Sequence, residues 1–355
     1  MERKRGKYAI MTVTSMGVRL TPLYRQPVHL SNVFQMQSTS AESNVLNVSA
    51  SLGKPVKLLT KFVKDNPVSA FIQGELRKRN IAFEGAFVTQ DGPWGVRHQI
   101  NVADSGYGLR GPRVYNDRAG EVGLTLRESD FDLDRIFGEE GCEIFHLSGL
   151  VAALSPEVGQ CCVSMAQKAK EKGSLVSFDL NYRASFWKDR EEELSKVFRQ
   201  IAETADILIG NEEDFQLALG IEGPQTEGKS VDQTESFQEM ITRAAKQYPN
   251  AKVFATTLRQ VLSANEHLWG AIMLAEGQWY IERPRSIPVL DRIGGGDGFV
   301  AGMLYGITQD WAPEDWIKFG WGTGAMAATL LEDYASPVSE EQVWGIYQGN
   351  ARVKR

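Results

Sequence analysis

A run of glycines beside an aspartate is the part of this 355-residue sequence whose residue types most directly indicate chemistry. Gly294, Gly295 and Gly296 precede Asp297, and an apolar stretch of helical character follows. Glycines that lead into a helix let successive backbone N–H groups and the helix dipole converge on one anion. A carboxylate there opposes anion binding unless it has another task, such as accepting the proton of a hydroxyl that attacks a bound phosphoryl group. We therefore predict that Asp297 is a general base and that the three glycines form the anion site of a phosphoryl transfer.

Other interpretations of the glycine run fit less well. A purely structural strand-to-helix turn, with Asp297 as a helix-start cap, would account for the glycines alone. A dinucleotide fingerprint normally follows an early strand and has an acidic residue about 20 positions later. Here the run comes late and the aspartate lies inside it. A Walker A loop would require Gly-Lys-Ser/Thr at the end of the run, where this run has Asp297-Gly298 instead.

The elements that must position this run alternate between strand and helix. Alternating elements predict an α/β fold with a doubly wound, mostly parallel sheet, in which ligands bind beyond the carboxyl ends of the strands. We predict a polar surface loop over 221–236. The predicted strands are 8–14, 56–62, 144–150, 175–180, 207–209, 253–257, 271–274 and 279–281, and the predicted helices are 44–52, 70–79, 156–172, 191–204 and 237–247.

Two β-rich segments, at about 15–40 and 85–120, are too small to fold alone. We predict that they lie together over the sheet edge as a small lid, and that the whole chain, 1–355, is a single α/β domain.

Composition excludes several classes of protein. Apolar residues make up 42%, charged residues 24%, and the net charge is −6, which is an ordinary globular balance. No Lys/Arg block suggests nucleic-acid binding, and no stretch approaches the roughly 18 apolar residues of a membrane span. Cys142, Cys161 and Cys162 have neither disulfide nor metal spacing. These features predict a cytoplasmic protein without nucleic-acid or membrane partners.

Several short motifs resemble those of the ribokinase-like (PfkB) carbohydrate kinases, and among them the 2-keto-3-deoxygluconate kinases. They occur in family order at 41–45, 115–119, 145–149, 179–183, 209–214, 257–259 and 291–306. The resemblance implies a ribokinase-like fold with a β lid. It also implies an ATP- and Mg²⁺-dependent carbohydrate kinase that converts a sugar or sugar acid, first of all 2-keto-3-deoxygluconate, to its 6-phosphate.

The resemblance implies roles for individual residues. Arg183 follows a strand in Asp-Leu-Asn-Tyr-Arg and could hold a substrate carboxylate bidentately; the alternative is a solvated arginine beside a turn. Small residues near 322–325 would admit adenine, although helix packing explains them almost equally well. The implied substrate-binding residues are Arg183, Arg118, Tyr115, Asn44, Ser40 and Arg97; the nucleotide-binding residues are Asn211, Thr257, Arg259, Gly322 and Gly324; Glu212 and Asp214 would hold Mg²⁺ through water.

The sequence departs from the family on the sugar side. Thr39 and Ser40 replace a glycine pair that lets the sugar approach the backbone, and their hydroxyls could instead bind a differently configured sugar. Two alternatives therefore stay open: a kinase of another small sugar, and a catalytically weak sugar-binding or regulatory protein. A homo-oligomer formed through the lid is a further expectation.

Overall fold

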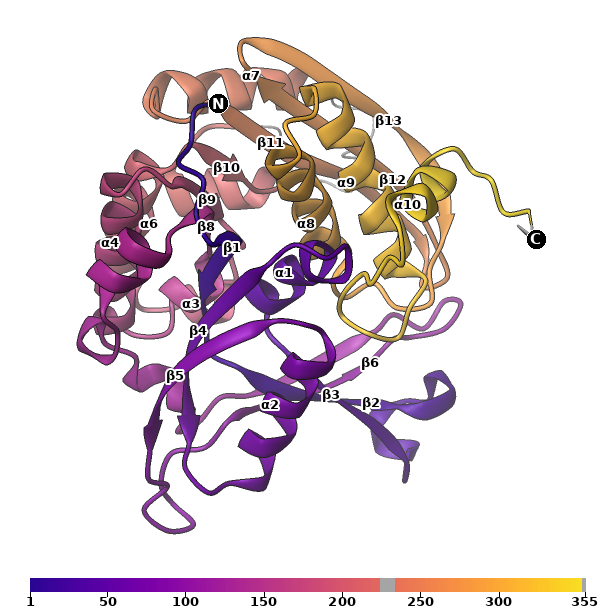
Figure 1. Cartoon of the computed structure of the whole chain (residues 1–355). Helices are drawn as coiled ribbons and strands as arrows, with labels where there is room; N and C mark the ends of the chain where they lie inside the picture. Colours follow the sequence, from indigo (N-terminus) through magenta and orange to yellow (C-terminus); the bar gives the residue numbers. More distant parts are fainter. Residues whose placement is uncertain (224–233, 353–355) are drawn as a thin grey trace.

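The computed structural model describes residues 1–223 and 234–352. In this part of the chain a nine-stranded sheet has the order β13-β12-β11-β10-β9-β8-β1-β4-β5 (Figure 1). Its strands are β1 (Tyr8–Val13), β4 (Val56–Val63), β5 (Ala82–Val88), β8 (Cys142–Ser148), β9 (Leu175–Asp179), β10 (Ile207–Ile209), β11 (Val253–Ser263), β12 (Glu266–Ala275) and β13 (Gln278–Pro288).

The prediction of a doubly wound, mostly parallel sheet is confirmed. All neighbours from β5 to β11 pair in parallel, and only the β11–β12 and β12–β13 pairings are antiparallel. Ser148 at the end of β8 lies opposite Asp179, which in turn lies opposite Ile209. The carboxyl ends of the central strands therefore reach the same edge of the sheet, where a ligand is expected.

Helices cover both faces of the large sheet, because neighbouring strand residues point to opposite sides. Phe145 packs into one apolar core and Ile144 into the other. The first core includes α3 (Gly149–Ala152), α4 (Pro156–Glu171), α5 (Ala184–Trp187), α6 (Glu191–Thr204) and α7 (Thr234–Gln247); the second includes α1 (Ala41–Ser51), α2 (Pro67–Lys78), α8 (Gly295–Thr308), α9 (Pro313–Ala328) and α10 (Glu340–Tyr347).

Capping side chains explain why two helices begin earlier than predicted. The hydroxyl of Ser40 accepts the N–H of Ser43, so α1 begins at residue 41 rather than 44. Asn66 caps α2 in the same way, so α2 begins at residue 67 rather than 70. Most of the predicted loop 221–236 lies outside the described residues, since 224–233 are not described.

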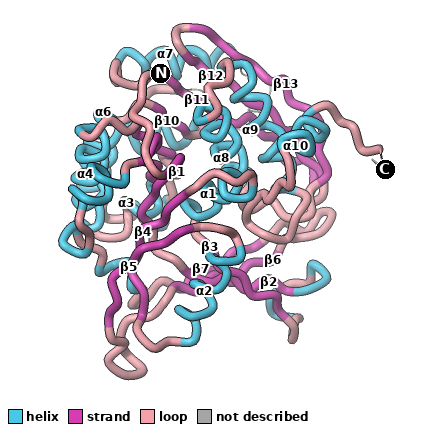
Figure 2. The backbone as a smooth tube through the Cα atoms, viewed as in Figure 1, coloured by secondary structure: helices cyan, strands magenta, loops and turns pink. Residues whose placement is uncertain are grey.

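A second sheet, of order β3-β2-β6-β7, lies beside the carboxyl edge of the large one (Figure 2). Its strands are β2 (Gly17–Pro22), β3 (Phe34–Thr39), β6 (Gln99–Asp104) and β7 (Arg113–Asp117). The predicted second lid segment started too early, because β5 belongs to the large sheet. β5 pairs in parallel with β4 from Ala82 to Val88, as the second strand of a β-α-β unit through α2.

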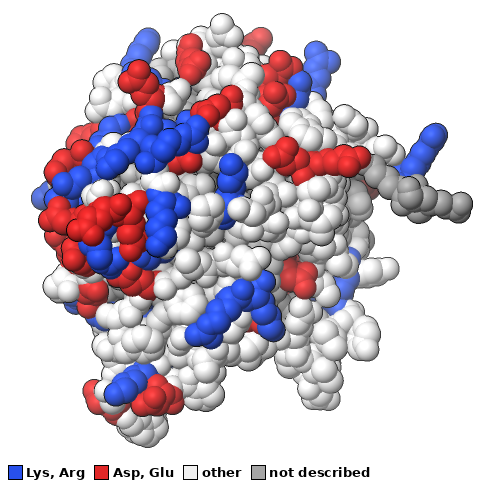
Figure 3. All heavy atoms as spheres, viewed as in Figure 1, with Lys and Arg blue, Asp and Glu red and all other residues white. Residues whose placement is uncertain are grey.

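Charges of both signs intermix on the surface over α4 and α6, whereas the face shown over the lid strands is largely uncharged (Figure 3). Among the described helices, none combines the length and apolarity that a membrane crossing would need.

Candidate active site

The backbone at the start of α8 forms an open anion site. Gly294 caps the helix at φ +82°, in the left-handed region that favours glycine. A Cβ at Gly294 would lie 1.9 Å from the carbonyl oxygen of Asp333, so only glycine fits against that chain segment. A Cβ at Gly296 would meet nothing within 4 Å. The first turn of α8 therefore borders open space beside Gly296, and the N–H groups of a first turn have no partner within the helix.

Asp297 lies in this first turn, and two features of its carboxyl fit the predicted role of a base. Asn44 in α1 donates from Nδ2 to Oδ2 of Asp297 at 2.7 Å. Burial raises the pKa of Asp297 to about 7; the hydrogen bond from Asn44 opposes this rise, and the nearby carboxylates of Asp333 and Glu42 add to it. A general base works best with a pKa near the working pH. The structure thus brings together the predicted Asp297 and Asn44.

A second buried carboxylate, Glu42, lies close to Asp297 and was not predicted as a site residue. Its two oxygens accept hydrogen bonds from the hydroxyls of Thr14, at 2.5 Å, and Ser148. Burial raises the pKa of Glu42 despite these bonds. Its position in the first turn of α1, two residues after the Ser40 cap and two residues before Asn44, was the available signal.

The lid is joined to the anion site through a buried arginine. Arg19 in β2 bridges Asp291, at 2.5 Å, and Asp333. Thr39 also donates to Asp333, at 2.7 Å, while Ser40 accepts the N–H of Ser43 and contacts the sulfur of Met16. The hydroxyls of Thr39 and Ser40 thus make contacts within the protein. This geometry does not favour the predicted hydrogen bonds from these hydroxyls to a sugar.

Asp214 joins two loops at the carboxyl edge. Its Oδ1 accepts the N–H of Tyr182 and its Oδ2 accepts the N–H of Asn211, both at 2.7 Å. The side-chain oxygen of Asn211 in turn accepts the N–H of Asp214 at 2.9 Å. Asp214 therefore holds the loops after β9 and β10 together. Both of its carboxylate oxygens already accept backbone N–H groups, whereas the prediction assigned them to water bound to Mg²⁺. Among the described residues, no cluster of three or more acidic, histidine or cysteine side chains could hold a metal ion.

Three arginines, Arg183, Arg259 and Arg292, lie close enough together to lower one another's pKa values or those of their neighbours. Arg183 is exposed, and its only hydrogen bond among those described is to its neighbour's carbonyl, that of Tyr182. Burial lowers the pKa of Arg259 to about 10, with Arg292 and Arg183 adding to the effect and Glu212 opposing it. The prediction had placed Thr257 and Arg259 beside the nucleotide, and both lie on the same face of β11. Arg292 was missed, although it lies within the glycine motif.

Two of the predicted substrate-binding arginines are engaged within the protein in this structure, so their contacts with substrate stay predictions. Arg118 donates from one guanidinium nitrogen to both oxygens of buried Glu121, at 2.9 and 3.1 Å, so its charge is already neutralised. Arg97 donates to the carbonyl of Ala119 and to the carboxylate of Asp117. Both arginines hold the return from β7 in place. The Arg118–Glu121 spacing of three residues in a turn was the signal that could have indicated this pair.

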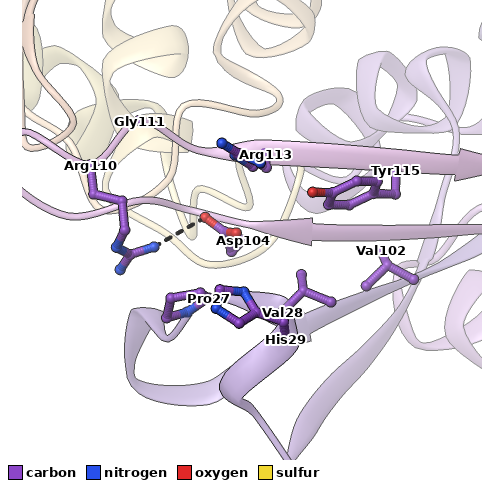
Figure 4. A pocket seen from close by; sticks show the side chains of 9 residues that line it. All are labelled: Pro27, Val28, His29, Val102, Asp104, Arg110, Gly111, Arg113 and Tyr115. Atoms are coloured by element: carbon purple, nitrogen blue, oxygen red, sulfur yellow. Dashed lines mark hydrogen bonds and ion pairs between the residues drawn. The ribbon is translucent and has the colours of Figure 1, made fainter.

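Tyr115 also lies away from the base. It is opposite Val102 in the β6–β7 pairing, whereas Arg19 is level with Asn101, so the two side chains project from opposite faces of the lid sheet. Figure 4 shows Tyr115 lining a cavity of about 480 Å³ together with Asp104 and residues of the turn at 27–29. Tyr115 therefore faces the outer side of the lid in this structure, and its predicted substrate contact stays untested.

Helix packing accounts for the two small residues in α9. A Cβ at Gly322 would lie 2.9 Å from the side chain of Val343 in α10. A Cβ at Gly324 would lie 2.7 Å from the indole of Trp269 and 2.9 Å from the carbonyl of Gly295. The packing alternative thus explains both glycines, and adenine is not needed to explain their size.

Comparison with known proteins adds the family. Residues 38–339 match the sequence profile described as pfkB family carbohydrate kinase. The chain is 23% identical to the 2-dehydro-3-deoxygalactonokinase of Haloferax volcanii over 98% of this chain and 99% of that protein. It is 23% identical to a 5-dehydro-2-deoxygluconokinase of Clostridium perfringens, over 91% of this chain and 88% of the other.

A solved structure is also similar over nearly the whole chain. The 2-dehydro-3-deoxygluconokinase of Thermotoga maritima superimposes with a TM-score of 0.87 and 28% identity, covering 96% of this chain and all of the other. The predicted ribokinase-like fold is thereby confirmed.

Proposed function

This chain belongs to the pfkB family of carbohydrate kinases, and we propose that it phosphorylates a keto-deoxy sugar acid at the expense of ATP. The first candidate is 2-keto-3-deoxygluconate, phosphorylated on its 6-hydroxyl. The observation that supports this most is the partly buried carboxyl of Asp297, with a pKa of about 7, in the first turn of α8. In the proposed reaction Asp297 takes the hydroxyl proton, the oxygen attacks the γ-phosphorus, and the bond to the β,γ-bridging oxygen breaks to release ADP.

The chemistry of the relatives and one arginine support an acid over a neutral sugar. The three similar proteins are named for kinases of oxo-deoxy-hexonates, which all carry a carboxylate. Arg118 is paired with Glu121, which leaves Arg183 as the proposed carboxylate clamp. A hydrogen bond to a charged group contributes about 1.5–3 kcal/mol, enough to decide between an acid and its neutral counterpart.

ATP and Mg²⁺ are the proposed cofactors. Glu212 is partly buried near Arg259, and burial raises the pKa of its carboxyl. With no direct ligand cluster among residues 1–223 and 234–352, Mg²⁺ would be held mainly by the nucleotide phosphates, with Asn211 and Glu212 reaching it through water. The ion would neutralise phosphate charge that the N–H groups of α8 cannot neutralise alone.

A panel assay tests the substrate. ADP release is measured with 2-keto-3-deoxygluconate, 2-keto-3-deoxygalactonate, 5-keto-2-deoxygluconate, fructose and ribose. We expect one of the three acids to give the highest kcat/KM. A neutral sugar that gives a higher kcat/KM than all three acids would contradict the acid assignment. Tight sugar binding without turnover of any compound would contradict the kinase assignment and favour a regulatory protein.

We also propose that a second copy of the chain covers the outer side of the lid. This side carries the cavity of Figure 4 and several exposed apolar side chains, which are typical of an interaction surface when they gather in one patch. Light scattering should report a dimer that Leu109→Glu together with Tyr115→Glu converts to a monomer; a monomeric wild type would contradict it. The exposed apolar residues on this side include Tyr24, Leu30, Val33, Met36, Leu109 and Tyr115.

A further inference from the structure

The backbone around Arg292 is held by its neighbours, whereas its guanidinium makes no hydrogen bond or ion pair in the part of the chain that the structure describes. Its neighbour Asp291 is fully buried, held by Arg19 at 2.5 Å, and accepts the N–H of Ile293 at 3.0 Å. Gly294 then turns the chain into α8. The guanidinium of Arg292 is half-buried, and among the described residues it forms no hydrogen bond or ion pair. A rigid main chain therefore presents a free guanidinium two residues before the anion site.

The β11–β12 hairpin brings a second set of groups to the same place. Arg259 lies opposite Trp269 and Val261 lies opposite His267, so Arg259, His267 and Trp269 share one face of the hairpin. This face points at the start of α8, because the Trp269 indole lies 3.9 Å from the position of a Cβ on Gly295. His267 is only 3% exposed, and its Nε2 has no hydrogen-bond partner among the described residues. An unpaired buried imidazole nitrogen indicates a ligand that would complete it.

The charges in this group repel one another. Burial lowers the pKa of Arg292, and the neighbouring Arg183 lowers it further. Burial, together with Arg259 and Arg292, lowers the pKa of His267 to about 4, so this imidazole is neutral at pH 7. Like charges gathered in a partly desolvated site destabilise the empty protein, and a polyanion would relieve that repulsion. Glu212 offsets only part of the charge, through Arg259. The group therefore fits a phosphate chain better than a single carboxylate.

We propose that Arg292 is a catalytic residue that donates hydrogen bonds to the non-bridging oxygens of the γ-phosphoryl group during its transfer. This proposal rests on the proposed kinase reaction. As the bond from the γ-phosphorus to the departing ADP oxygen breaks and the bond to the acceptor oxygen forms, the proton goes to Asp297 and Arg292 remains protonated. Its guanidinium stabilises charge on oxygens that belong to neither ADP nor the acceptor. Arg259 and His267 lie on the ADP side of the same phosphate chain.

The test compares wild type with Arg292→Met and Arg292→Lys. We expect Arg292→Met to lower kcat about 10²–10³-fold, to leave the KM of the acceptor near the wild-type value, and to leave ADP affinity within about twofold. Lysine keeps the charge but not the fork of donors, so Arg292→Lys should recover part of kcat. Arg243→Met is the matched control: Arg243 lies in α7 and contacts Glu239 and the carbonyl of Glu222, away from the site.

Other outcomes would overturn the proposal. A raised acceptor KM with unchanged kcat would assign Arg292 to the carboxylate of the sugar acid. Equal losses of ADP and ATP affinity, with unchanged kcat, would make it a general nucleotide contact. These measurements use whichever acceptor the wild type phosphorylates, so they stand if 2-keto-3-deoxygluconate fails as substrate. If no acceptor is found, a non-hydrolysable ATP analogue decides: Arg292→Met should weaken its binding several-fold more than that of ADP, and an unchanged ratio contradicts the proposal.

Discussion

The amide of Asn44 donates to the carboxyl of Asp297 over 2.7 Å, although the two residues lie 253 positions apart. The bond joins α1, whose first turn also carries Glu42, to the anion-binding start of α8. A hydrogen bond to the charged form lowers a carboxyl pKa, and here it works against burial and against two nearby carboxylates. The resulting pKa near 7 depends on this balance, so the pair can be tested from both sides.

Removing the proton acceptor should remove turnover. Asp297→Asn keeps the size of the side chain and its contact with Asn44, but an amide cannot take the proton from the hydroxyl of the sugar. We expect kcat to fall by roughly 10²–10⁴-fold with nucleotide affinity nearly unchanged. Steady-state kinetics together with calorimetric ADP binding measure the two quantities. Turnover within a few-fold of wild type would show that another group is the base.

The pH dependence should report the same carboxyl. Only the ionised form of Asp297 accepts a proton, so kcat/KM should fall about tenfold per pH unit below roughly pH 7 and level off above it. Removing Asn44's hydrogen bond, in Asn44→Ala, should move the inflection upward, because the ionised form loses a donor. An inflection that stays in place in Asn44→Ala, or that lies near pH 4 in the wild type, would contradict the assignment.

The raised pKa of Asp297 also predicts how the free energy of unfolding changes with pH. An acid whose pKa is higher in the folded state binds more protons when folded, so stability falls as pH rises from its ordinary range to about 7. Asp297→Asn removes this effect. The melting temperature of the variant, relative to that of the wild type, should therefore be higher at pH 8 than at pH 5. A difference in melting temperature that is equal at the two pH values would contradict the raised pKa.

Local signals in the sequence predicted much of the fold and the centre of the site. The glycines and Asp297 act through neighbouring backbone, and alternating apolar runs mark the parallel strands, so both could be predicted. The strands β11 to β13 are longer than predicted because their outer halves carry polar residues, such as Arg259 and Gln260, that break the apolar pattern. Two helices begin three residues earlier than predicted because Ser40 and Asn66 cap them. Both residue types are common helix caps, so the sequence contained this signal.

The rest depended on pairing across the chain. The face on which Tyr115 lies follows from the register of β6 and β7, and a shift of one residue would have reversed it. Arg19 meets Asp291 and Asp333 at sequence separations of 272 and 314 residues, which no local pattern reports. The sugar side of the candidate site is built from such distant pairs, so local patterns in the sequence could not predict its contacts.

The buried bridge of Arg19 should matter for stability. Arg19→Met leaves Asp291 and Asp333 buried without their cation, and breaking a buried ion pair in this way costs about 3–5 kcal/mol. Urea unfolding measures this cost. Arg97→Met is the control in the same lid, because Arg97 pairs with Asp117 at the surface, where such pairs contribute about 0–1 kcal/mol. Equal losses in the two variants would contradict a special role for the buried bridge.

The last prediction concerns the acid group of the substrate. Arg183 is exposed beside Asp297, lowers the pKa of that carboxyl, and makes no ion pair among those described. A carboxylate clamp of this kind should favour the proposed acid, and Arg183→Met should largely abolish the preference for it over fructose in kcat/KM. Arg118→Met provides the comparison, because Arg118 is already neutralised by Glu121; its loss should destabilise the lid without changing the preference. If the preference survives in Arg183→Met and disappears in Arg118→Met, the ion pair with Glu121 opens when substrate binds, and the clamp must be moved to the lid.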